Sequence, residues 1–207
     1  MNRHDPKGRV GLIVDEWGTW YDVEPGTNPG FLYQQSTLRD AQVAALTLNI
    51  FNRHASRVVM ANLAQTVNVL QAVILTEGDK MVLTPTYYVF DLYKAHQEGL
   101  LVPSHVETDE SAPGVCRLSA SASRKDNVLT VTVANTSATE GTEAVISLSG
   151  TKPAAAHGRM LAGEMHAKND FDASPVAIQP LADIAIQGDE VRVSLPACAV
   201  AEITITL

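Results

Sequence analysis

The first hundred residues alternate short apolar runs with longer stretches in which apolar side chains recur at helical spacing. Residues 10–14 and 57–61 are nearly continuous apolar runs, which are typical of parallel strands buried on both faces. Residues 36–53, 63–72 and 84–97 show the helical spacing. Because strands and helices alternate, this half of the chain predicts parallel βα units.

Two of the predicted helices have recognisable starting residues. Ser36 or Thr37 is placed to serve as the N-cap of the first helix. Thr84 precedes Pro85 at the start of the last one, and proline is favoured at the first helical position.

In the second half of the chain, the periodicity changes to that of a strand. Apolar and polar side chains alternate in residues 128–133, 190–195 and 201–207, and turns that contain glycine separate such runs. This pattern predicts an antiparallel β-sandwich in which each sheet has one solvent-exposed face. We therefore divide the chain into residues 1–98, of the α/β class, and residues 99–207, an all-β sandwich domain.

The α/β half is too short to close a barrel of its own. A (β/α)8 barrel typically takes about 250 residues, whereas only two βα units are recognisable here. An isolated pair of strands with two apolar faces would leave bare sheet edges and apolar helix surfaces in water. The pattern therefore predicts that this half belongs to a larger structure.

The composition narrows the classes of partner and location. A formal net charge of −8 without a cluster of basic residues argues against a nucleic-acid partner. No apolar stretch reaches the roughly 20 residues of a membrane span, so we expect no membrane partner. The first nine residues are charged and lack the apolar core of a signal peptide, which favours a cytoplasmic location.

The residue types that bind metals or act as alternative nucleophiles are scattered. The six histidines form no metal-binding motif and no phosphate-binding loop occurs, so we expect neither a metal nor a cofactor. A serine nucleophile would need a Gly-x-Ser-x-Gly turn, which the sequence lacks. Cys116 and Cys198 have no metal-ligand spacing, and a disulfide between them stays an open alternative.

One acidic motif lies where an enzyme of the α/β class places its chemistry. Asp15-Glu16-Trp17-Gly18 follows the first predicted strand, and the carboxyl ends of parallel strands carry the catalytic groups of barrel enzymes. An ionised carboxylate can attack an anomeric carbon, and tryptophan offers an apolar platform for a sugar ring. On local sequence alone, an N-cap or another structural hydrogen-bonding role is the more common alternative.

Longer stretches of the chain resemble glycoside hydrolase family 51. The acidic motif opens the first of them, and the others follow in the same order and spacing as in that family. The last stretch, which contains His166, resembles a late segment of the family's β-sandwich. The segments are residues 15–22, 25–35, 49–52, 60–71, 83–88 and 161–180.

This resemblance implies a fold and a set of site residues. The resemblance implies a retaining α-L-arabinofuranosidase, and such enzymes combine a (β/α)8 barrel with a β-sandwich. Residues 1–98 then correspond to the last βα units of the barrel. Glu16 corresponds to the nucleophile at the end of strand seven, and Trp20 and Gln65 correspond to residues that contact the sugar. Asn62 is a weaker substrate-binding candidate, with a helix-start cap as its alternative role.

The resemblance also identifies what the sequence lacks. The family's acid/base is a glutamate preceded by asparagine near the end of strand four, and no Asn-Glu pair occurs here. A retaining mechanism needs two carboxyl groups about 5–5.5 Å apart. Asp15, Asp22, Glu24 and Glu77 show no pattern that would make one of them a substitute. We therefore predict that this chain alone is inactive.

The expected partner is a saccharide with terminal non-reducing α-L-arabinofuranosyl units, and the resemblance implies a homo-oligomeric full-length form. Two alternatives stay open: a non-catalytic structural or carbohydrate-binding sandwich module, and one half of a split enzyme. Residues 100–207 contain no tryptophan and only Phe171 among the large aromatic residues. This composition favours a structural role for the sandwich.

Overall fold

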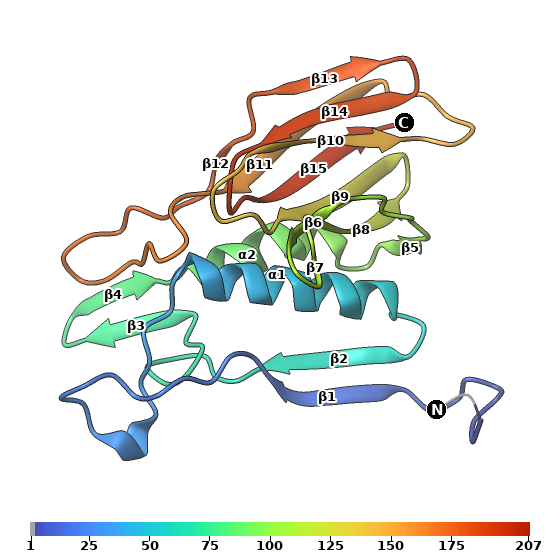
Figure 1. Cartoon of the computed structure of the whole chain (residues 1–207). Coiled ribbons are helices and arrows are strands. Elements are labelled where there is room, and N and C mark those ends of the chain that lie inside the picture. Colours follow the sequence, from blue (N-terminus) through green and yellow to red (C-terminus); the bar gives the residue numbers. More distant parts are fainter. Residues whose placement is uncertain (1–2) are drawn as a thin grey trace.

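The computed structural model describes residues 3–207, which form four stacked layers (Figure 1). A two-stranded parallel sheet lies at one end of the stack, and helices α1 (Leu38–Arg53) and α2 (Pro85–Tyr93) form the second layer. A six-stranded sheet packs on the helices, and a three-stranded sheet covers its other face. None of the helices in residues 3–207 is both long and apolar enough to cross a membrane.

The parallel sheet consists of β1 (Leu12–Trp17) and β2 (Val58–Leu63). Its strands are largely exposed: Ile13, Val59 and Met60 have exposed fractions of 50%, 65% and 52%. The burial on both faces that the apolar runs predict is not seen within residues 3–207, where these two strands form the whole sheet. Within residues 3–207, no further strand pairs with either outer edge of the sheet, so much of its apolar surface is uncovered.

Helix α1 begins where the sequence predicts, with Thr37 as its N-cap. The Thr37 backbone N–H donates to the carboxylate of Asp40 at 2.8 Å, which is one half of a capping box. Helix α2 begins with the predicted proline and continues as the 3-10 helix η2 (Lys94–His96). A second 3-10 helix, η1 (Pro29–Phe31), lies in the loop between β1 and α1.

The predicted helix over residues 63–72 is wrong. Most of this segment forms turns, which lead into a hairpin of β3 (Ile74–Glu77) and β4 (Lys80–Leu83). Asn68 and Gln71 have φ angles of 56° and 53°, in the left-handed region that interrupts a helix. The apolar spacing of residues 63–72 predicted a helix. The Gln71 side chain instead bonds to Thr19 and Asp40, which are distant in the sequence, and these bonds hold the segment in a turn.

The remaining strands build the predicted antiparallel sandwich. The six-stranded sheet has the order β12-β11-β15-β9-β8-β5, and the three-stranded sheet has the order β10-β14-β13. A short β6-β7 hairpin forms a separate small sheet. The strand bounds are β5 (Leu100–Val102), β6 (Glu110–Ala112), β7 (Val115–Cys116), β8 (Leu118–Lys125), β9 (Val128–Asn135), β10 (Thr142–Ser147), β11 (Ala155–Leu161), β12 (Gln179–Pro180), β13 (Ile184–Gln187), β14 (Glu190–Leu195) and β15 (Val200–Thr206).

The six-stranded sheet is buried on both faces at its centre. One face packs against the three-stranded sheet in an apolar core that includes Val131, Val193 and Ile203. Helices α1 and α2 cover the other face, so that Thr132 of β9 is fully buried. The prediction of one solvent-exposed face per sheet is wrong for this sheet, because helices from the first half of the chain cover its polar side.

A second apolar cluster joins the two halves of the chain. Leu38, Val89 and Leu92 from the helices pack with Leu161 and Val200 from the sandwich. All five side chains are fully buried. Residues on both sides of the predicted domain boundary therefore share one core.

Polar side chains extend this junction between the helices and the sandwich. The Tyr93 hydroxyl donates to the side-chain oxygen of Asn49 at 2.8 Å. The two ring nitrogens of His96 lie 2.7 Å from Ser123 Oγ and 2.9 Å from Thr132 Oγ1. Burial lowers the pKa of His96 to about 4, so the imidazole is neutral at physiological pH.

Candidate functional site

The acidic motif lies at the carboxyl end of β1. Asp15 and Glu16 belong to this strand, and both side chains are exposed. Trp17, the last residue of the strand, is partly buried, and its ring centroid lies 5.5 Å from that of Phe51 and 6.1 Å from that of Phe90. These aromatic contacts fix the position of the end of β1, where Glu16 lies.

The chain turns directly after Trp17, at a position that requires glycine. Gly18 has a φ of 141°, a conformation that L side chains rarely adopt. A Cβ on Gly18 would also lie 2.7 Å from Cγ of Gln71. Glycine therefore lets the loop after β1 approach the segment after β2 closely.

A buried carboxylate, Asp40, ties both of these loops to helix α1. Its exposed fraction is 0%. The Thr19 hydroxyl donates to Oδ1 at 2.8 Å, the Gln71 amide donates to the same oxygen at 3.2 Å, and the Thr37 N–H donates to Oδ2 at 2.8 Å. The Gln71 amide also contacts the Thr19 hydroxyl. Because Thr19 follows β1 and Gln71 follows β2, one carboxylate sets the position of both loops.

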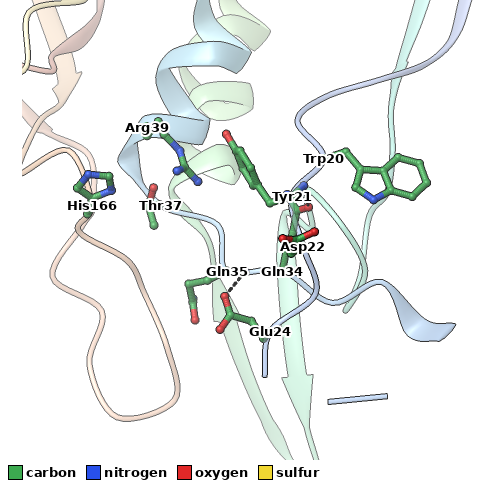
Figure 2. Close-up of a pocket in the computed structure, with 9 residues that line it drawn as sticks. All are labelled: Trp20, Tyr21, Asp22, Glu24, Gln34, Gln35, Thr37, Arg39 and His166. Carbon is green, nitrogen blue, oxygen red and sulfur yellow. Dashed lines mark hydrogen bonds between the residues drawn. The ribbon is translucent and has the colours of Figure 1, made fainter. Parts of the chain in front are cut away.

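Trp20 stands at the rim of a pocket of about 650 Å³, and 69% of its surface is exposed. The pocket walls come from the loop after β1, from the approach to α1 and from the loop between β11 and β12. In Figure 2, Trp20 projects on one side, whereas Thr37, Arg39 and His166 lie on the other. Glu16 is not among the residues that line this pocket.

Hydrogen bonds fix the wall of this pocket. The Gln34 side chain accepts from the Tyr21 N–H at 2.9 Å and donates to the Thr19 carbonyl at 3.1 Å. The guanidinium of Arg39 lies over the Tyr21 ring, 4.0 Å from its centroid. Burial and the negative charge of Asp40 raise the pKa of Tyr21 above its ordinary value, so the phenol stays protonated at neutral pH.

The candidates on the second parallel strand lie at the same end of the sheet as Glu16. Asn62 belongs to β2, Gln65 follows that strand, and both are exposed. The Ala64 N–H donates to the Trp17 carbonyl at 3.0 Å, which places the two strand ends side by side. The alternative role of Asn62 as a helix cap is wrong, because turns rather than a helix follow β2.

Sequence reasoning missed three residues that shape this end of the molecule: Asp40, Gln71 and Arg39. The spacing of Thr37 and Asp40 is a capping-box signal, so the sequence did contain a mark for Asp40. No local signal marks Gln71, because its partners Thr19 and Asp40 lie 52 and 31 residues away in the sequence.

The cysteines stay apart. Cys116 is exposed, Cys198 is buried, and both are free thiols, so the alternative of a disulfide between them is not realised. Burial raises the pKa of the Cys198 thiol. Within residues 3–207, no group of three or more His, Cys, Asp or Glu side chains is placed to hold a metal ion.

Comparison with known proteins identifies the family to which this chain is similar. The family described as "Alpha-L-arabinofuranosidase C-terminal domain" matches residues 15–199. The chain is also 43% identical over 204 residues to the intracellular exo-alpha-L-arabinofuranosidase of Bacteroides ovatus. That alignment covers 95% of this chain and 40% of the Bacteroides protein.

Solved structures give the same result. The crystal structure of the glycoside hydrolase family 51 arabinofuranosidase from Xanthomonas axonopodis pv. citri matches with a TM-score of 0.92 and 41% identity, over 100% of this chain and 43% of that one. The arabinose complex of the α-L-arabinofuranosidase from Thermotoga maritima matches with a TM-score of 0.85 and 25% identity, over 100% and 45%. The chain thus spans less than half the length of these relatives. It belongs to the α-L-arabinofuranosidases of glycoside hydrolase family 51 and corresponds to their C-terminal region.

Proposed function

We propose that this chain supplies the nucleophile of a retaining glycosidase that removes terminal non-reducing α-L-arabinofuranosyl units. The observation that carries the proposal is the exposed carboxylate of Glu16 at the carboxyl end of a parallel strand, inside the segment that matches the family. In this proposal, residues 1–98 contain the last βα units of a (β/α)8 barrel, and residues 99–207 form its β-sandwich domain.

Glu16 attacks the anomeric carbon while the bond from that carbon to the leaving oxygen breaks. A covalent arabinosyl-enzyme forms, and a water molecule then releases the sugar with its original anomeric configuration. A second carboxyl group protonates the leaving oxygen and afterwards takes a proton from the water. We place this group in the part of the relatives' length that the chain does not span, so the chain alone is inactive.

The remaining candidate residues bind the sugar in this proposal. Trp20 offers an exposed indole face to the ring, Gln65 hydrogen-bonds its hydroxyls, and Asn62 adds a weaker polar contact. The substrates are arabinose-containing polysaccharides and oligosaccharides. We further propose a cytoplasmic location, since the Bacteroides relative is named as intracellular. A homo-oligomeric full-length form is proposed on the family resemblance alone.

Reconstitution tests the proposal. The chain is co-expressed with the portion of the Bacteroides ovatus relative that lies outside the aligned segment, and hydrolysis of an aryl α-L-arabinofuranoside is measured. We expect no hydrolysis by either part alone and measurable hydrolysis by the pair. Glu16→Gln lowers that rate by more than about a thousandfold, the scale on which loss of a nucleophile acts in other covalent catalysts.

Two further readouts separate a nucleophile from a merely structural acid. Glu77→Gln is the matched control, because Glu77 is an exposed glutamate in the β3-β4 hairpin, and its rate stays close to that of the unmodified pair. With Glu16→Ala, added azide restores turnover and yields an arabinofuranosyl azide of inverted configuration. Full activity of the Glu16→Gln pair would show that another group attacks the sugar.

A further inference from the structure

We propose that Asn169 of the β-sandwich is a positioning residue, which holds the β11–β12 loop (residues 162–178) against the β1–α1 loop that carries Trp20. The inference rests on the proposed function and extends it to the part that the sandwich plays in the reaction. Residues 162–178 contain no helix and no extended strand. Loops as long as this are uncommon in compact domains, and the ordered ones usually have a function.

The β11–β12 loop completes the start of helix α1. The first N–H groups of a helix have no acceptor within the helix itself. Here the N–H groups of Leu38 and Arg39 donate to the carbonyls of Ala167 and Met165, at 2.9 and 2.8 Å. The sandwich therefore supplies acceptors that the helix lacks, and the loop and the start of α1 form one unit.

Asn169 fixes the shape of the β11–β12 loop and ties it to the β3-β4 hairpin. Its exposed fraction is 0%. The Asn169 Nδ2 donates to the Val176 carbonyl at 2.7 Å, and Oδ1 accepts from the N–H of the same valine at 2.9 Å. Nδ2 also donates to the carbonyl of Leu83 in β4 at 2.9 Å. Because Val176 packs in the cluster that joins the helices to the sandwich, one amide group connects loop, hairpin and helix layer.

The β11–β12 loop also contacts the end of the β1–α1 loop. The Lys168 ammonium donates to Oε1 of Gln35 at 3.3 Å, and an isolated antiparallel bridge pairs Lys168 with Thr37. Phe171 and Tyr33 pack against the same small apolar cluster at the hairpin. The chain that follows the nucleophile strand therefore rests on the sandwich before it enters α1.

The Gln34 side chain extends this support to Trp20. It bonds to both neighbours of the tryptophan, since it accepts from the Tyr21 N–H at 2.9 Å and donates to the Thr19 carbonyl at 3.1 Å. Gln34 directly precedes Gln35, which the β11–β12 loop contacts. The position of Trp20 thus depends on a loop of the sandwich domain.

Loosening the β11–β12 loop displaces Trp20, although Asn169 itself lies outside the pocket that Trp20 lines. A displaced sugar-contacting wall raises KM, because each folded molecule binds the substrate more weakly. A mere loss of folded protein lowers kcat and leaves KM unchanged, since the molecules that remain folded bind as before. The value of KM therefore separates a positioning role from a structural one.

Asn135 is a matched control, because it is a second buried asparagine with the same bonding pattern. Its exposed fraction is also 0%. Its Nδ2 donates to the carbonyls of Glu140 and Pro196, each at 2.9 Å, and its Oδ1 accepts from the Ser137 N–H at 3.1 Å. These partners lie in other connections between sandwich strands. Asn135→Ala therefore removes as many hydrogen bonds as Asn169→Ala and leaves the β11–β12 loop in place.

Hydrogen exchange on the 207-residue chain, followed by nuclear magnetic resonance, tests the docking of the loop without requiring catalysis. We expect the N–H groups of Leu38 and Arg39 to exchange at least about tenfold faster in Asn169→Ala than in Asn135→Ala, because their acceptors move away. The N–H of Ile203, in the central strand β15, reports global opening. Its exchange rate changes equally in the two variants.

Two further readouts follow the effect to Trp20 and to the substrate. The chain has two tryptophans, so its spectrum holds two indole N–H signals, and Trp20→Phe assigns them. We expect Asn169→Ala to shift the Trp20 signal and Asn135→Ala to leave it in place. In the reconstituted pair, Asn169→Ala raises the KM for the aryl α-L-arabinofuranoside by about fivefold or more relative to Asn135→Ala.

Equal exchange of Leu38 and Arg39 in the two variants, an unmoved Trp20 signal or an unchanged KM would each overturn the inference. Phe171→Ala is the second variant should Asn169→Ala not fold, since it removes a partly buried ring from the same loop, and the same results are expected. Absence of turnover by the unmodified pair counts against the proposed function instead. The exchange rates and the indole signal are measured on the chain alone, so the two failures are distinguishable.

Discussion

At the scale of single residues, Asp40 has the most demanding environment near the candidate site. Its carboxylate is fully buried and accepts hydrogen bonds from Thr19, Thr37 and Gln71. A buried carboxylate is tolerated only when such donors replace the water that it has lost. The same bonds keep the loop after β1 and the loop after β2 in a fixed relation to α1.

Asp40→Asn tests this role. The new amide group presents N–H donors where the carboxylate accepted them, so at least one present donor loses its acceptor. We expect the free energy of unfolding, measured by urea titration, to fall by about 1–3 kcal/mol. The fluorescence of Trp20 changes in the folded state, because its loop is no longer held by Thr19.

The matched control is Asp79→Asn, at an exposed position in the turn of the β3-β4 hairpin. A surface change of this kind usually alters the free energy of unfolding by less than about 0.5 kcal/mol. Equal destabilisation by the two variants would contradict the special role of Asp40.

The sequence indicated some of these residues and not others for a physical reason. Glu16 and Trp20 stand in one contiguous motif, so a resemblance identifies both. Gln71 acts through partners that are far away in the sequence, and its contacts exist only once the chain has folded. Local spacing therefore gives no sign of it.

At the scale of elements, the junction between helices and sandwich contains a titratable group. His96 lies between the hydroxyls of Ser123 and Thr132, and burial lowers its pKa from 6.5 to about 4. Between these two pH values the unfolded chain binds a proton that the folded chain does not. The contribution of His96 to stability is therefore complete above about pH 6.5 and is lost as the pH falls toward 4.

His96→Gln removes this dependence. We expect the unmodified chain to lose about 2–3 kcal/mol more stability than the variant between pH 7 and pH 4, as judged by urea titration at each pH. His105→Gln is the control, since His105 is an exposed histidine whose side chain is 83% accessible. Identical pH profiles for the unmodified chain and His96→Gln would show that this histidine does not control the junction.

The elements were predictable where one periodicity dominated. Helix α1 and strands β9, β14 and β15 lie close to the predicted bounds, because their apolar positions repeat over six residues or more. Residues 63–72 mimic a helix over a short stretch, but the bonds of Gln71 favour a turn. The burial of Thr132 also escaped prediction, because the covering helices come from a distant part of the chain.

At the scale of the whole molecule, the parallel sheet has an apolar surface in contact with solvent. Ile13, Val59 and Met60 have exposed fractions of 50%, 65% and 52%. In the proposed enzyme, the rest of the barrel buries this surface. A charge placed on it therefore interferes with reconstitution.

Met60→Lys tests that expectation against Met81→Lys, the same change at a similarly exposed methionine of β4. We expect Met60→Lys to lower the activity of the reconstituted pair by at least about tenfold, because an unpaired ammonium is costly to bury. Met81→Lys retains the activity. Circular dichroism verifies that both variants fold, and equal activities would show that β2 lies outside the assembled interface.

The core that α1 and α2 share with the sandwich constrains how related genes recombine. A crossover near residue 98 would pair helices from one parent with a sandwich from another, and it would separate Leu38 and Leu92 from the Leu161 and Val200 side chains that they contact. A crossover in the loop at residues 25–30 leaves this packing intact. In chimeras with that junction, the helices and the sandwich come from the same parent gene. The segment that should be exchanged as one piece therefore begins before α1 and includes the whole sandwich.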